Sequence, residues 1–110
     1  MAVYAKKLEQ IREEAKLSRN DVARILGTTS RTVFRWARGN TPRGESRERL
    51  LELAAVVDQL SKVMRPEAAS AWLFEPNPLL DMQRPVDLVG RGDYQRVCAA
   101  ITAIAEGVFV

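Results

Sequence analysis

The side chains of this 110-residue chain that are best suited to ligand chemistry gather between positions 19 and 38, in the string RNDVARILGTTSRTVFRWAR. Ala23 is small enough for two short helices to cross closely, and Gly27, four residues later, tolerates the positive φ of a tight turn. Val33 and Trp36 would bury the inner side of the second helix. Its outer side would then carry hydroxyl groups, three arginines and one aromatic ring: Thr29, Ser30, Arg31, Phe34, Arg35 and Arg38.

This pattern is typical of a helix-turn-helix, whose second helix enters the major groove of DNA. Arginine can bridge O6 and N7 of guanine, and hydroxyl groups reach phosphates or base edges. We therefore predict that the six outer residues bind DNA, with Trp36 as a core anchor. Phe34 leaves two alternatives open, because its ring could contact a thymine methyl group or fold back onto the core.

The distribution of charge favours this interpretation over an ordinary helical hairpin whose arginines only solvate its surface. Between Lys16 and Arg43, seven basic residues stand against one acid, Asp21. Residues 1–65 carry a net charge of +6, from fourteen basic and eight acidic residues, whereas residues 66–110 carry −3, from three and six. A block this basic is the electrostatic footprint of a protein that binds phosphate backbones.

The composition excludes several classes of function. Hydrophobic residues make up 46% of the chain and charged residues 28%, which predicts a folded domain. Histidine is absent and Cys98 is the single cysteine, which excludes a His-based triad, a disulfide framework and a Cys-cluster metal site. No apolar run approaches the roughly 18 residues of a membrane span, and the N-terminus has no apolar signal core. We expect a soluble cytoplasmic protein that uses no cofactor or metal and is not an enzyme.

Apolar residues recur at helical spacing along nearly the whole chain, which predicts an all-α fold: a helix-turn-helix bundle followed by a helical second domain. A capping box at residues 18–21 and the glycines at 27, 39 and 107 mark where helices begin and end. Asp93 is expected to cap the last helix. The predicted helices cover residues 2–17, 18–26, 29–38, 46–64, 66–74, 85–89 and 94–106. Two domains are predicted, residues 1–64, which include the long connecting helix, and residues 65–110.

The predicted helix over 46–64 is apolar around much of its circumference, and such helices are buried on several sides. In so small a protein we expect part of that cover to come from a second copy, which predicts a homodimer. The apolar positions form one main stripe with three residues beyond it: Leu50, Leu53, Ala54, Val57, Leu60 and Met64, then Leu51, Val56 and Val63.

The second half shows no chemistry of its own, but its strings resemble a known family. These strings are AWLFEPNPLL at 71–80, RPVDLV at 84–89, GDYQRV at 92–97 and AEGVFV at 105–110. They resemble the toxin-binding domain of Xre/MbcA/ParS antitoxins, and the ending resembles mycobacterial members of that family. The resemblance implies an antitoxin of a type II module whose partner is a RES-domain toxin that consumes NAD. It further implies a dimer that represses its own operon and covers the NAD pocket of the toxin with its C-terminal segment.

From this resemblance we mark two groups of residues as candidate toxin contacts. They are Trp72, Pro76, Asn77 and Leu79 within the second half, and Glu106, Gly107, Val108, Phe109 and Val110 at its end. The residues alone leave open whether the last three insert into a partner or fold back on the last helix, and the resemblance favours the partner. The alternative function is a stand-alone helix-turn-helix regulator whose second half dimerises or senses a ligand.

Overall fold

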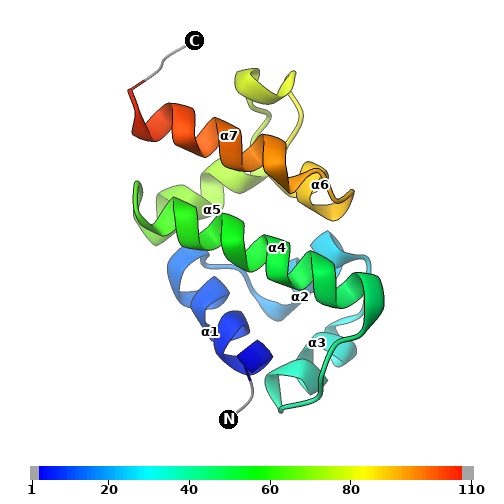
Figure 1. The fold of residues 1–110 in the computed structure, drawn as a ribbon. Coiled ribbons are helices and arrows are strands. Elements are labelled where there is room, and N and C mark those ends of the chain that lie inside the picture. Colours follow the sequence, from blue (N-terminus) through cyan, green and yellow to red (C-terminus); the bar gives the residue numbers. More distant parts are fainter. Residues whose placement is uncertain (1–2, 108–110) are drawn as a thin grey trace.

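The computed structural model describes residues 3–107, and every regular element in that range is helical (Figure 1). The predicted all-α fold, a helix-turn-helix bundle followed by a helical second half, is confirmed. No helix in the described range is both long and apolar enough to cross a membrane. The elements are α1 (Val3–Ala15), α2 (Arg19–Leu26), α3 (Ser30–Ala37), α4 (Gly44–Ser61), α5 (Pro66–Phe74), the 3-10 turn η1 (Pro78–Leu80), α6 (Pro85–Gly90) and α7 (Tyr94–Ala105).

Helix α4 forms the centre of the molecule, with α1 packed against one side and α7 against the other (Figure 1). Because these contacts run in both directions, one continuous hydrophobic core serves the described chain. Helix α4 therefore takes part in the packing of both predicted domains, and the boundary at residue 64 stays a prediction. Five side chains of α4 are completely buried: Leu50, Leu53, Val56, Val57 and Leu60.

The apolar breadth of α4, which predicted a homodimer, is largely used inside the chain. Of its large apolar side chains only Leu51 stays exposed, at 38%, joined by Val63 at 37% just after the helix. The helix also differs from the predicted 46–64, because it begins at Gly44 and ends at Ser61. The chain leaves the helix before Pro66, since a proline ring disfavours helical backbone in the preceding residue, and Arg65 has a ψ of 160°.

The first helix is likewise shorter than the predicted 2–17. It ends at Ala15, and Lys16 adopts a positive φ of 55°, which no α-helix can continue. Leu17 is only 2% exposed although it lies in the linker after the helix. The prediction was too long because this apolar residue fits the helical spacing of α1 but is buried without being helical. At the other end of α1, Val3 is 59% exposed.

Helix α6 packs against α2 and so joins the second half to the helix-turn-helix. Gly90, the last residue of α6, allows the two backbones to approach closely. A Cβ atom at this position would lie 2.7 Å from the carbonyl oxygen of Ile25, well inside van der Waals contact. A groove of about 590 Å³ opens beside this contact, lined by the end of α2, by Phe74 and by α6.

Candidate functional site

Helix α2 begins at the capping box and ends at the glycine that the sequence predicted. Ser18 and Asp21 form the capping box: the Asp21 N–H donates to the Ser18 hydroxyl at 3.1 Å, and the Ser18 N–H donates to the Asp21 carboxylate at 2.9 Å. Gly27 has a φ of 72°, and the N–H of Thr28 donates to the carbonyl of Ala23 at 2.9 Å. This is the hydrogen-bond pattern of a helix that ends at a left-handed residue.

Asp21 stays ionised in this setting. Partial burial alone would raise the pKa of its carboxyl, but hydrogen bonds with the backbone and side chain of Ser18 and with Arg24 lower it, and the net shift of the pKa is downward. The Arg24 guanidinium lies 2.7 Å from the carboxylate. The charged carboxylate therefore holds the first turn of α2 at neutral pH, where a negative charge is favourable.

The inner side of α3 anchors the helix to the core. Val33 is completely buried and Trp36 is 5% exposed, which confirms Trp36 as a core residue. At the start of the helix, the Thr29 hydroxyl accepts a hydrogen bond from the Thr32 N–H at 3.1 Å and so caps α3. These contacts fix the angle at which the opposite side of α3 faces solvent.

The opposite side of α3, here called the α3 face, presents its arginines without acidic partners. Arg31, Arg35 and Arg38 are exposed, and none of them forms an ion pair with any residue in the range 3–107. Arg24 is the one cation between residues 16 and 43 that pairs with a described acid. The surplus positive charge that the sequence indicated is thus available to an external anion. The α3 face consists of Thr29, Ser30, Arg31, Phe34, Arg35 and Arg38.

Phe34 lies on the surface and does not fold back onto the core, with 40% of its area exposed. Two guanidinium groups lie against its ring, that of Arg19 at 4.8 Å from the ring centre and that of Arg38 at 5.7 Å. These distances are within the range of cation–π attraction. The Phe34 ring therefore holds the guanidinium groups of Arg19 and Arg38 at the α3 face.

Two residues of α2 join the α3 face that the sequence pattern did not select. Arg19 reaches it through Phe34, and the side chain of Asn20 accepts a hydrogen bond from the Ser30 hydroxyl. Arg19 and Asn20 lie between Ser18 and Asp21, so their positions in the sequence indicated only the start of a helix. Their position next to the start of α3 adds a cation and a polar group to the surface of the helix-turn-helix.

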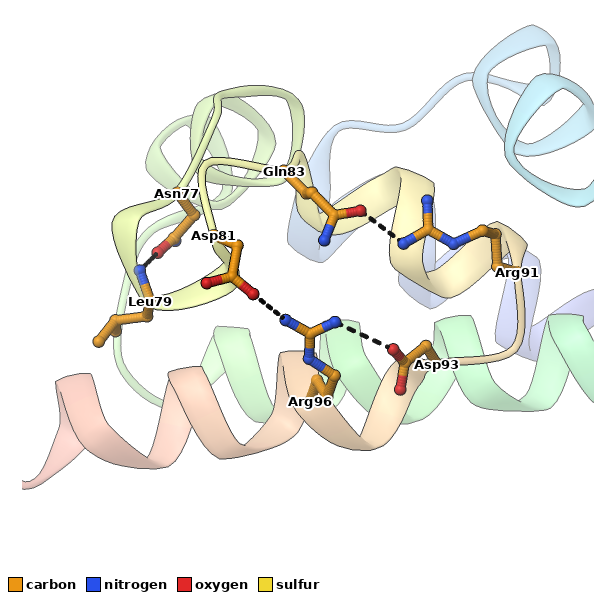
Figure 2. A network of polar contacts seen from close by, with 7 residues as sticks. All are labelled: Asn77, Leu79, Asp81, Gln83, Arg91, Asp93 and Arg96. Carbon is orange, nitrogen blue, oxygen red and sulfur yellow. Dashed lines mark hydrogen bonds and ion pairs between the residues drawn. The ribbon is translucent and has the colours of Figure 1, made fainter.

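The second region of interest is the loop over residues 76–84, here called the 76–84 loop, which contains η1. Asn77 organises it, and at 7% exposure it is the one buried polar residue in the described range. Its side-chain oxygen accepts the N–H of Leu79 at 2.9 Å (Figure 2). Its backbone carbonyl accepts the N–H groups of Leu80 at 2.9 Å and Met82 at 2.8 Å, and its own N–H donates to the carbonyl of Gln83 at 3.1 Å. Asn77 thus positions the loop from inside.

An ion pair and a hydrogen bond hold the same loop from outside. Arg96 on α7 lies 3.0 Å from Asp81 in the loop and 3.3 Å from Asp93 (Figure 2). Arg91 donates to the side-chain oxygen of Gln83 at 2.6 Å. Asp93 stands at the start of α7 as predicted, but the prediction that its side chain caps the helix is wrong, because it makes no capping hydrogen bond and its carboxylate pairs with Arg96.

The structure separates the predicted partner-binding residues by exposure. Pro76 is exposed, Trp72 and Leu79 are half-buried, and Asn77 is buried within the loop. Glu106 and Gly107 are exposed where the chain leaves α7. The three remaining residues of this group, Val108, Phe109 and Val110, lie outside the described residues.

The two regions lie at opposite ends of a molecule whose longest dimension is 41 Å. Figure 1 shows α3 and the start of α1 at one end, and the 76–84 loop with the last turn of α7 at the other. Helix α4 lies between them. The two regions are therefore separate surfaces of the described chain.

Comparison with known proteins matches the parts of the chain that contain the two regions. Residues 52–107 match the profile described as "Antitoxin Xre/MbcA/ParS C-terminal toxin-binding domain", and residues 8–58 match a helix-turn-helix profile. The chain is similar to "Mycobacterial cidal antitoxin MbcA" of Mycobacterium tuberculosis, with 44% identity over 99 residues, which cover 89% of this chain and 88% of the relative. It is also similar to "Probable mycobacterial cidal antitoxin Rv3188" of the same organism, with 33% identity over 109 residues, or 99% and 94% of the two chains.

The same comparison extends to the fold. A chain in the solved structure titled "Crystal structure of the M.tuberculosis MbcT-MbcA toxin-antitoxin complex" matches this one with a TM-score of 0.90 and 41% identity. The match covers 100% of both chains. The resemblance drawn from the strings in the second half is thereby confirmed in sequence and in fold.

Proposed function

Because this chain belongs to the Xre/MbcA/ParS antitoxin family, we propose that it neutralises a cognate toxin by binding it directly. The observation that carries this proposal is the extent of the similarity. It covers the toxin-binding profile over 52–107 and the whole of a chain from a toxin–antitoxin complex. Neutralisation by binding requires no catalytic group in the antitoxin. Since NAD and an operator are both found in the cytoplasm, that is where the protein would act.

The proposed partner is a RES-domain toxin that consumes NAD, and the proposed blocking element is the C-terminal segment. The string AEGVFV at 105–110 supports this, because it resembles the ending of family members. Gly107 has a φ of 78°, so the backbone turns away from the axis of α7 before Val108. Glu106, Gly107 and the apolar residues 108–110 would occupy the NAD pocket and exclude the substrate.

Around this segment, the body of the second half would supply further contacts. Pro76 and Leu79 lie on the 76–84 loop, and Trp72 is half-buried on the preceding helix. We assign direct contact to these three residues. Asn77, which is buried, would act by holding the loop in shape.

The experiment is co-expression with the toxin encoded beside this chain, purification of the complex, and measurement of NAD consumption. Deletion of Val108–Val110 should leave an antitoxin with an unchanged melting temperature that still binds the toxin but no longer stops NAD turnover. If the toxin stays fully inhibited, inhibition comes from the surface around Trp72 and Leu79 instead. If the full chain forms no complex, the antitoxin proposal fails and the stand-alone regulator is favoured.

A second function, binding of operator DNA and repression of its own operon, is supported by the α3 face. The observation that favours it is the set of exposed arginines that lack acidic partners within the described residues. Arginines of this kind can read guanine in the major groove, while Arg19 and Lys16 add charge for the phosphates. The variants that test this function are given in the Discussion.

We retain the homodimer as part of this proposal, because paired half-sites in DNA normally engage two copies of a helix-turn-helix. Within the described range, Leu51 and Val63 are the exposed large apolar residues on and beside α4 that a second copy could cover. Light scattering at micromolar concentration measures this directly. A strictly monomeric mass in the absence of DNA would remove the pre-formed dimer.

A further inference from the structure

Met82, in the 76–84 loop, combines high exposure with an unusual backbone conformation. It is 61% exposed, more than any other large hydrophobic residue in the described range. Its φ is 64°, and that of Asp81 before it is 55°, so two consecutive residues with side chains adopt left-handed backbone. This conformation is unfavourable for residues other than glycine and persists only where the surroundings impose it.

The surroundings of Met82 do impose it. The N–H of Met82 donates to the carbonyl of Asn77 at 2.8 Å. Figure 2 shows the neighbouring Asp81, whose carboxylate lies 3.0 Å from Arg96 on α7. The Met82 side chain itself contributes nothing to the described core. The hydrogen bonds of the buried Asn77 and the ion pair of Asp81 with Arg96 on α7 thus hold a backbone whose Met82 side chain is exposed.

We propose that Met82 is the apolar anchor by which the 76–84 loop docks onto the cognate toxin. This inference rests on the proposed function above. It requires an apolar depression on the toxin, into which the long, flexible and polarisable methionine side chain would fit. The backbone that carries the anchor is already ordered, so docking would cost little conformational entropy.

Three observations select the toxin as the occupant. Met82 lies within residues 52–107, the span of the toxin-binding profile. The 76–84 loop packs on α7 and lies at the same end of the molecule as the point where the C-terminal segment leaves that helix (Figure 1). The neighbouring Pro76 and Pro78 are exposed, and their fixed φ adds rigid apolar surface around the anchor.

The test is the affinity of the full-length chain for the purified toxin, measured by titration calorimetry. Met82→Gln, which keeps the length of the side chain but removes its apolar character, should weaken binding by about 10- to 100-fold. Met82→Leu should restore most of the affinity. Val3→Gln is the matched control, because Val3 is 59% exposed at the opposite end of the molecule, and it should leave the affinity unchanged.

Met82→Gly separates the anchor from the shape of the loop. Glycine accepts a φ of 64° without strain, so this variant should keep the melting temperature of the wild type while it loses affinity like Met82→Gln. Wild-type affinity in Met82→Gln or Met82→Gly would overturn the inference while the antitoxin function stands. A wild-type chain that fails to bind the toxin would instead overturn the proposed function. A change in oligomeric mass with unchanged toxin affinity would show that Met82 contacts a second copy, which also overturns the inference.

Discussion

The two ends of the molecule use arginine in opposite ways. On the α3 face, Arg31 and Arg35 project from the helix and Arg38 from the residue that follows it, and none has an acidic partner within the described residues. At the other end, Arg96 is shared between two carboxylates and Arg91 is bound to Gln83. The first arrangement leaves positive charge free for an external ligand. In the second, the arginines bind groups of the same chain and hold the 76–84 loop in its conformation.

This difference indicates what each surface can recognise. Free guanidinium groups at fixed helical spacing suit a regular polyanion, and DNA is such a ligand. A loop whose charges are internally satisfied offers its partner apolar surface and shape, as in the core of a protein–protein interface. The net charges agree with this difference, since residues 1–65 carry +6 and residues 66–110 carry −3.

The largest effect is expected when the charge on the α3 face is removed. Replacing Arg31 and Arg35 with alanine should weaken operator binding by about 2–6 kcal/mol, since each base-reading arginine contributes about 1–3 kcal/mol. Binding to the toxin should not change, because the proposed toxin contacts lie at the other end of the molecule. Gel shifts and calorimetry measure the two affinities, and Arg65→Ala, another exposed arginine, is the control. Unchanged DNA affinity in the double variant would show that the α3 face is not the recognition surface.

The next largest effect concerns the contact that joins the two halves. Gly90→Ala would place a Cβ atom 2.7 Å from the carbonyl oxygen of Ile25, so α6 or α2 must shift. We expect a loss of about 1–3 kcal/mol in the free energy of unfolding, which is typical of overpacking. Urea unfolding measures it. A stability equal to that of the wild type would show that the two halves tolerate relative movement.

The sequence was sufficient where a structure is local. The capping box of Ser18 and Asp21, the left-handed turn at Gly27 and the inward Trp36 each follow from residues within a few positions of one another. The same holds for the outward arginines of α3, because helical spacing alone separates the two sides of a helix.

The sequence was insufficient to predict structure that depends on contacts between residues far apart in the chain. Asp81 and Arg96 are fifteen positions apart, and nothing in either string indicates that they pair. Neither Asp81 nor Met82 is a glycine, so nothing in the string predicts their left-handed backbone or the exposure of the Met82 side chain. The width of the apolar stripe on α4 was misleading for a related reason, since it could not show that α1 and α7 cover opposite sides of one helix.

A smaller effect is expected from the residue that organises the 76–84 loop. Asn77→Ala removes the acceptor for the Leu79 N–H inside a buried site, and we expect a loss of about 1–2 kcal/mol in the free energy of unfolding. Toxin affinity should fall as well, while DNA affinity should not. Asn40→Ala, at an exposed asparagine beyond α3, is the control for stability. If Asn77→Ala kept full toxin affinity, the shape of the loop would not matter for docking.

The smallest effect is a dependence on pH to which a carboxyl in each half of the chain should contribute unequally. The pKa of Asp21 is lowered on balance by Ser18 and Arg24 against the effect of burial, and the pKa of Asp87 is lowered chiefly by its hydrogen bonds with Arg84. A carboxyl whose pKa is lower in the folded state stabilises the fold above its unfolded pKa of about 3.9, and this stabilisation is lost as the pH falls through the folded value. Stability should therefore be constant from neutral pH down to about pH 5 and decrease below that, as far as these two groups control it.

Variants at the two positions separate the contributions of Asp21 and Asp87. Asp21→Asn should cost about 0.5–2 kcal/mol at pH 7, because it weakens a capping box, and less at pH 2, where the wild-type carboxyl is itself protonated. Asp87→Asn should cost less at pH 7, since both partners of its ion pair with Arg84 are about half exposed and screened by solvent. Urea unfolding at the two pH values measures both. A cost of Asp21→Asn that is the same at pH 2 as at pH 7 would mean that the charge of Asp21 plays no part in holding α2, and that its oxygen atoms alone cap the helix.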